Sequence, residues 1–300
     1  MSTRPLSRRR FLRISAAVPL CGLSRNALAA ASTTSWRGQA LGAQAQIIVA
    51  GLDPAEAAPV FAQVRDEIAR LETILSLYRP HSELSRLNAT GALMSPSADL
   101  LEVLSLSKSV WQASGGSFDP TIQPLWIARA LGEPAPAPSG DFGDVVFSAK
   151  AARLKPGSAL TLNGIAQGYI TDRVAELLRR LGLQNVIVDA GEQRAWGSRP
   201  EGGAWRVGIA DPSGTVVRNL TLKDRALATS SSRGTVLTDG RGHIIDARSG
   251  LSAQLWNTLS VTHETAALAD ALSTAACCLN TQETEAMLGH FPSASLAYRG

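Results

Sequence analysis

The sequence is poor in the residues on which disulfide-stapled proteins, zinc proteins and many hydrolases depend. It has 3 cysteines and 4 histidines in 300 residues. Cys277 and Cys278 are adjacent, which strains a disulfide between them, and the histidines are too scattered for a zinc site. No Gly-x-Ser-x-Gly motif occurs, which excludes a nucleophile elbow. The fold must therefore be stabilised by its core, for which a hydrophobic content of 45% is sufficient.

Long apolar runs are also absent, so no transmembrane span is expected in the mature chain. The N-terminus nevertheless predicts export. Residues 7–15 read SRRRFLRIS, followed by the weakly apolar AAVPLCGL and by ALAAA, which offers small residues for cleavage. Ser-Arg-Arg-x-Phe-Leu-Arg resembles the twin-arginine signal, which passes folded proteins across the inner membrane. We predict a cleaved signal peptide over residues 1–30, a single domain over 31–300 and a periplasmic location.

The formal net charge of +4 comes from this N-terminal segment. The segment holds six arginines and no acid, and removing them from the 29 basic residues leaves 23 against 25 acidic residues, a net charge of −2. The mature protein is therefore slightly acidic. Its composition gives no support to nucleic-acid binding.

The apolar pattern predicts strands interspersed with helices. We expect a helix from Asp53-Pro54, with Val64, Ile68, Leu71 and Leu75 on its buried face, and a second from the cap Ser97 to about Ala113. A glycine-rich turn should lead into a third helix that stops at Gly182, and a fourth follows Ala267. Strands are expected at 36–50, 185–191, 204–210, 226–230, 243–247 and 258–262. The predicted class is α+β, with helices packed on mixed or mostly antiparallel sheets.

The stretch ALADALSTAACCL, residues 267–279, contains an unexpected carboxylate. Asp270 and Thr274 are four residues apart, so both project from one face of a helix. Asp270 on a solvated face, with Thr274 bonded to its own backbone, is one explanation. Ala and Leu surround Asp270, however, and an unpaired buried carboxylate is costly. A cation bound by the two side chains is the other explanation.

Several separated segments combine Gly, Ser, Thr and Asp where strands or helices should end. They read SLYRPHSELSRLN, GGSFDPTIQPLW, TLNGIAQGY, ATSSSRG and GHIIDARSG, in that order along the chain. A glycine-rich turn before a helix can accept an anion on its backbone N–H groups. Each segment is also compatible with ordinary packing, and His243 is compatible with a core histidine. Together they suggest a ligand site.

In this order, together with VIVDAG and ADALSTA, the motifs resemble the FAD:protein FMN transferases, the ApbE family, through nearly all of the mature chain. The resemblance implies transfer of the FMN half of FAD to a Ser or Thr hydroxyl of a target protein, with release of AMP. It implies Mg²⁺ bound by Asp270, Thr274 and the backbone of Gly164, with Ser273 nearby, and His243 as the catalytic base or orienting group. The flavin-binding positions would be Leu41, Tyr78, Asp119, Thr121, Thr161 and Gln167. Arg79 and Arg233 are candidates for phosphate contacts.

The chain departs from the family pattern in places. Thr161 and Gln167 replace an acid and a charged residue, and the block NAGGD appears as DAGEQ, so that Glu192 and Gln193 replace a glycine and an acid. Ala247 stands where proline is common. A non-catalytic FAD carrier and a pyrophosphatase that splits FAD to FMN and AMP therefore remain alternatives. The implied partner is an external acceptor flavoprotein with a Ser/Thr flavinylation motif, of the kind found in membrane-associated respiratory proteins.

Overall fold

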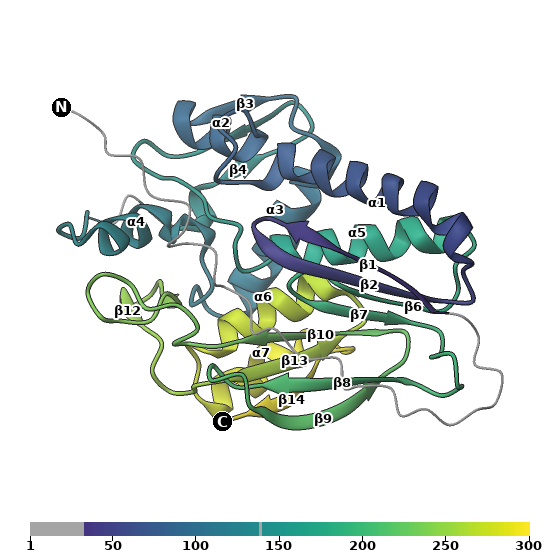
Figure 1. Cartoon of the computed structure of the whole chain (residues 1–300). Helices are drawn as coiled ribbons and strands as arrows, with labels where there is room; N and C mark the ends of the chain where they lie inside the picture. The colour runs from purple at the N-terminus through teal and green to yellow at the C-terminus, as the bar shows by residue number, and fades with distance from the viewer. Residues whose placement is uncertain (1–32, 138–139) are drawn as a thin grey trace.

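The computed structural model describes residues 33–137 and 140–300. The predicted signal peptide lies outside this part of the chain. A seven-stranded sheet forms the centre of the molecule (Figure 1), in the order β1-β2-β6-β7-β10-β13-β14, with every neighbouring pair antiparallel. Its strands are β1 (Thr33–Ala40), β2 (Ala43–Ala50), β6 (Val186–Asp189), β7 (Gln193–Trp196), β10 (Arg225–Ser230), β13 (Leu259–His263) and β14 (Ser295–Arg299).

The strand predicted at 36–50 is in fact a hairpin of two strands. Leu41 and Gly42 join β1 to β2 with φ angles of 47° and 84°. Two consecutive left-handed residues make the tight turn whose twist suits antiparallel strands. A leucine occupies the first left-handed position, so the sequence pattern shows no break at the turn. The prediction of one strand was therefore wrong.

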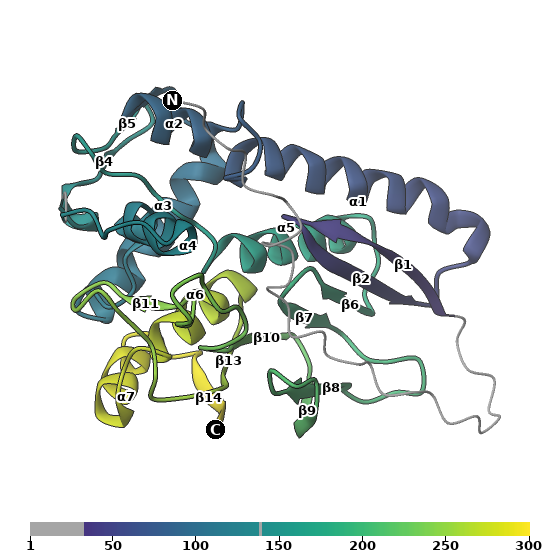
Figure 2. The same ribbon diagram turned by 60° about the vertical axis from the view of Figure 1, so that its left-hand side comes forward.

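Three helices cover one face of the sheet: α1 (Pro54–Leu75), α5 (Ala166–Arg180) and α6 (Ala266–Ala276). Both views show α1 and α5 above β1, β2 and β6 (Figures 1 and 2). Helix α6 packs against α5 and lies on β10 and β13. Alanines on nearly every side of α6 are buried, as is typical of a helix enclosed within a core.

The opposite face is covered by the hairpin of β8 (Trp205–Ala210) and β9 (Val216–Leu222). Trp205, Val207 and Ile209 pack there with Ile187 and Leu227 from the large sheet. Successive residues of a strand point to opposite faces, so Ile187 serves this smaller core while Val186 and Val188 serve the main one.

The remaining elements complete the described chain. They are α2 (Glu83–Thr90), β3 (Ala92–Met94), α3 (Ala98–Ala113), η2 (Pro120–Ile122), α4 (Gln123–Leu131), η3 (Phe142–Asp144), β4 (Val146–Phe147), β5 (Ala151–Arg153), β11 (Ile245–Asp246), β12 (Leu251–Ser252) and α7 (Thr281–Gly289). Strands β3, β5 and β4 form a small sheet. None of the helices in residues 33–137 and 140–300 has the length and apolar character needed to cross a bilayer.

The predicted fold class, α+β with antiparallel sheets and packed helices, is confirmed. The starts of α1 and α3 were also predicted correctly, since Asp53 and Ser97 accept hydrogen bonds from the first-turn backbone N–H groups. Helices α2, α4 and α7 were missed. The strand predicted at 243–247 is shorter than expected, and His243 itself lies in a bend.

Candidate functional site

A cleft of about 1150 Å³ opens beside the ends of β6, β7 and β10. Residues from the turn before α5, the face of α6, the segment 117–122 and the segment 243–245 also line it. The volume is slightly above the usual range of small-molecule sites, which is about 300–1,000 Å³. The walls carry carboxylates, hydroxyls and amides together with apolar side chains such as Phe118, Trp126 and Ile244. A large ligand with both flat and charged parts fits this lining.

The glycine-rich turn before α5 is held in place by Asn88 of α2. The Asn88 Oδ1 accepts from the N–H of Leu160 at 2.7 Å, and its Nδ2 donates to the carbonyl of the same residue at 2.8 Å. The turn then passes against α6. A methyl group on Gly164 would lie 3.0 Å from Cγ2 and 3.2 Å from Oγ1 of Thr274. The turn and Thr274 are therefore in direct contact.

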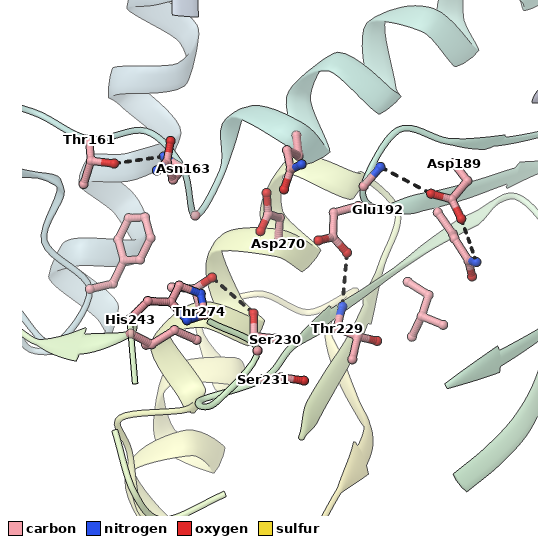
Figure 3. A pocket seen from close by; sticks show the side chains of 18 of the residues that line it. Thr161, Asn163, Asp189, Glu192, Thr229, Ser230, Ser231, His243, Asp270 and Thr274 are labelled. Carbon is pink, nitrogen blue, oxygen red and sulfur yellow. Dashed lines mark hydrogen bonds between the residues drawn. The ribbon is translucent and has the colours of Figure 1, made fainter. Parts of the chain in front are cut away.

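Asp270 and Thr274 of α6 face the cleft (Figure 3). Asp270 is 4% exposed, so it does not lie on a solvated helix face. Its Oδ2 accepts from the N–H of Gly168 at 3.1 Å. The Thr274 hydroxyl lies 3.2 Å from that of Ser230, which in turn lies 2.7 Å from the hydroxyl of Ser273. The carboxylate, the hydroxyls and the turn thus form one connected group.

Burial raises the pKa of Asp270 to about 7, because the charged form loses its hydration. A divalent cation would favour the charged form, and carboxylate, hydroxyl and carbonyl oxygens are the ligands that Mg²⁺ prefers. Across the described parts of the chain, no group of three or more His, Cys, Asp or Glu side chains is arranged to hold a metal. The set of Asp270, Thr274 and the backbone of Gly164 instead offers few protein ligands, which suits an ion that keeps waters and substrate phosphates.

His243 lies on the same cleft. Its Nδ1 lies 3.3 Å from the carbonyl oxygen of Thr235, and its backbone N–H donates to that oxygen at 3.1 Å. Since a carbonyl can only accept, the ring hydrogen is on Nδ1 and Nε2 keeps its lone pair. Burial lowers the pKa of His243 to about 4. The imidazole is therefore neutral at pH 7 and can accept a hydrogen bond or a proton.

Asp119 contributes a further carboxylate to the cleft. Its Oδ1 accepts at 2.7 Å from both the N–H and the hydroxyl of Thr121, and its Oδ2 accepts at 3.0 Å from the N–H of Phe142. Burial raises its pKa despite these bonds. Thr121 thus orients Asp119 and is not itself part of the cleft lining.

The cleft brings together most of the residues that the sequence singled out. Those that line it are Asp119, Thr161, Gly164, Gln167, His243, Asp270 and Thr274. Leu41, Tyr78, Arg79 and Arg233 do not. The backbone N–H of Leu41 donates to Glu72 at 2.8 Å, and Arg79 forms an ion pair with the same glutamate. Tyr78 is hydrogen-bonded to the side chain of Asn163, which lines the cleft.

Sequence reasoning missed a buried ion pair behind the site. Asp172 of α5 accepts from Arg194 of β7 at 2.7 Å and from the N–H groups of Ala266 and Ala267 at 2.8 and 2.9 Å. It therefore caps the N-terminus of α6 from another helix, while Thr265 makes no side-chain cap. Its spacing on α5 gave no signal of this role, because its partners are far away in the sequence.

The fold and cleft define an α+β protein with an oxygen-rich site beside a glycine-rich turn. The chain belongs to the ApbE family, whose model matches residues 41–297. A FAD:protein FMN transferase of Chlamydia pneumoniae is 27% identical over 293 residues, which cover 88% of this chain and 89% of that protein. One of Escherichia coli strain K12 is 25% identical over 261 residues, covering 78% and 74%.

Solved structures share the fold. The flavin transferase ApbE from Vibrio cholerae has a TM-score of 0.75 at 23% identity, with 86% of this chain and 90% of that chain covered. The ApbE protein from Thermotoga maritima has a TM-score of 0.76 at 23% identity, with 88% and 93% covered.

Proposed function

We propose that this protein is a Mg²⁺-dependent FAD:protein FMN transferase. The observation that carries the proposal is the convergence of Asp270, Thr274 and the turn at Gly164 with the neutral His243 on one large cleft. The names of its relatives give the substrate and the reaction class. The residues that differ from the family pattern, Thr161 and Gln167, lie on the same cleft as polar, uncharged groups.

In the proposed reaction, a Ser or Thr hydroxyl of the acceptor protein forms a bond to the FMN-side phosphorus of FAD. The bond from that phosphorus to the bridging oxygen breaks, and AMP leaves. The product is a phosphoester between FMN and the acceptor. Mg²⁺ held by Asp270, Thr274 and the carbonyl of Gly164 would neutralise charge on the pyrophosphate.

His243 acts on the acceptor hydroxyl in this scheme. The contact of its Nδ1 with Thr235 leaves Nε2 to accept the hydroxyl hydrogen. A pKa of about 4 keeps the imidazole in this accepting form throughout the physiological range. Asp119, oriented by Thr121, and the side chains of Thr161 and Gln167 would hold the flavin. Leu41 and Tyr78 are proposed as flavin contacts at the periphery.

We further propose that the enzyme works in the periplasm after twin-arginine export. The export motif, which lies outside the described residues, supports this location. Transport of a folded protein would allow FAD to be loaded before export. The acceptor would be a separate flavoprotein, to be sought among membrane-associated respiratory proteins. The nearest match in this chain to a Ser/Thr-Gly-Ala-Ser/Thr acceptor motif, TGAL at Thr90, lacks the final hydroxyl.

The test is an assay of purified protein with FAD, Mg²⁺ and a panel of candidate acceptors, in which mass spectrometry detects FMN on the acceptor and chromatography detects AMP. His243→Gln should lower the turnover rate by about 10²–10⁴-fold, and Asp270→Asn should abolish the Mg²⁺-dependent turnover. Asp66→Asn, on the exposed face of α1, is the matched control and should behave as wild type. AMP release without acceptor labelling would indicate a pyrophosphatase, and bound FAD without AMP release would indicate a carrier.

A further inference from the structure

Glu192 is a buried carboxylate on the wall of the cleft. It lies between β6 and β7, lines the cleft and is 8% exposed. Its Oε2 accepts from the N–H of Thr229 at 3.1 Å. Its carbonyl accepts from the hydroxyl of Thr171 at 3.1 Å, so α5 holds the backbone at this position. One hydrogen bond therefore holds the carboxylate, and the other holds the backbone that carries it.

The carboxylate of Glu192 points toward that of Asp270 (Figure 3). Burial and the charge of Asp270 both raise the pKa of Glu192. Within the described residues, no lysine or arginine forms a salt bridge with either side chain. Two buried like charges without a cationic partner are strongly unfavourable. A proton on one of the carboxylates or a bound cation relieves this repulsion, and only the cation lets both carboxylates keep their charge.

Each of the two carboxylates also has an oxygen available. The Oδ2 of Asp270 and the Oε2 of Glu192 accept backbone hydrogen bonds, whereas Oδ1 and Oε1 have no hydrogen-bond partner among residues 33–137 and 140–300. Both side chains are more than nine-tenths buried, and both line the cleft. Free carboxylate oxygens that converge in this way are suited to a hard divalent cation.

We propose that Glu192 is an additional ligand, direct or through one water, of the cation held by Asp270, Thr274 and Gly164. This inference rests on the proposed function, since it adds to the same cation site. A second carboxylate raises the negative charge of the site, so the cation should bind before FAD supplies its phosphates. The protein would then hold its metal in the absence of substrate.

The experiment measures Mn²⁺ binding to the full-length protein without FAD, by electron paramagnetic resonance or calorimetry. Glu192→Gln should weaken binding by about tenfold or more. Glutamine keeps an oxygen that can accept from Thr229, so a role limited to that hydrogen bond would leave the affinity unchanged. Asp189→Asn is the control for the loss of one negative charge from the cleft. The Oδ1 of Asp189 accepts from the N–H of Gly191, and its Oδ2 accepts from the side chain of Gln193. Because both oxygens are already hydrogen-bonded, replacing Asp189 should weaken Mn²⁺ binding much less.

A second measurement separates metal binding from folding. Without metal, Glu192→Gln should unfold at the same temperature as wild type or a higher one, because the repulsion from Asp270 is gone. With Mn²⁺ it should gain less stability than wild type. Equal Mn²⁺ affinity in Glu192→Gln and wild type, with weaker binding in Asp270→Asn, would overturn this inference and leave the proposed function standing. Failure of wild type to bind Mn²⁺ even with FAD present would overturn the proposed cation site itself.

Discussion

Replacing Gly168 with alanine should separate α5 from α6, the two helices at the proposed cation site. Gly168 lies in the first turn of α5, where that helix passes the start of α6. A methyl group there would lie 2.3 Å from the carbonyl oxygen of Ala266 and 2.8 Å from Cα of Ala267. Both atoms belong to the backbone, so no side-chain rotation relieves the overlap, and α6 must move away from α5.

The magnitude follows from three contributions. Overpacking of a core costs about 1–3 kcal/mol. Weakening the hydrogen bond from Gly168 to the buried carboxylate of Asp270 costs about 1.5–3 kcal/mol, and the helix propensity of alanine returns about 1 kcal/mol. We therefore expect Gly168→Ala to lower the free energy of unfolding by about 1.5–5 kcal/mol and to weaken Mn²⁺ binding.

Urea unfolding followed by circular dichroism measures the first effect. The matched control is Gly289→Ala at the end of α7, where an added methyl group meets no atom within 4 Å. That variant should be as stable as wild type or up to about 1 kcal/mol more stable. If Gly168→Ala matched wild type within about 0.5 kcal/mol, the range of ordinary surface substitutions, the close approach of α5 and α6 described above would be wrong.

Three further predictions concern buried polar groups. Arg194→Leu leaves Asp172 without its charge partner and should lower the free energy of unfolding by about 3–5 kcal/mol near pH 7. The loss should be smaller toward pH 4, where Asp172 is protonated and neutral because its pKa is raised to about 6. A loss of stability that does not vary with pH would contradict this account. His243 should titrate near pH 4 by NMR and not near 6.5. Because the unfolded chain binds the proton at a higher pH than the folded protein, the free energy of unfolding should fall by about 3 kcal/mol between about pH 6.5 and pH 4. His243→Asn should lack this pH-dependent loss. Asn88→Ala removes both hydrogen bonds to the glycine-rich turn and should cost about 1–3 kcal/mol in urea unfolding, whereas Asn88→Asp should retain part of the stability.

The fold was predictable from the sequence where the signals are local. The caps Asp53 and Ser97 and the apolar stripe of α1 depend on residues within a few positions, and they were interpreted correctly. Helix α7 also carries a local signal, the capping box of Asn280 and Glu283, which was overlooked. The turn at Leu41 could not be predicted from nearby residues, because its backbone N–H donates to Glu72, which lies in α1.

The candidate site shows the same division. The spacing of Asp270 and Thr274 indicates a shared helix face, and the structure has both on the cleft. Their surroundings come from elsewhere in the chain: the hydrogen bond from Gly168 to Asp270 joins residues 102 positions apart. The position of Glu192 opposite Asp270 depends on how β6 pairs with β7 and how β7 pairs with β10, on which α6 packs. No local pattern reports such a pairing.

The cap that Asp172 provides for α6 has a consequence for protein engineering. The start of α6 depends on a carboxylate that is 94 residues earlier in the chain, and that carboxylate depends on an arginine of β7. In a chimera that takes α6 alone from a relative, the first N–H groups of α6 would meet an α5 of different sequence. Exchange of the ADALST helix between family members should therefore succeed only when α5 and β7 are transplanted with it.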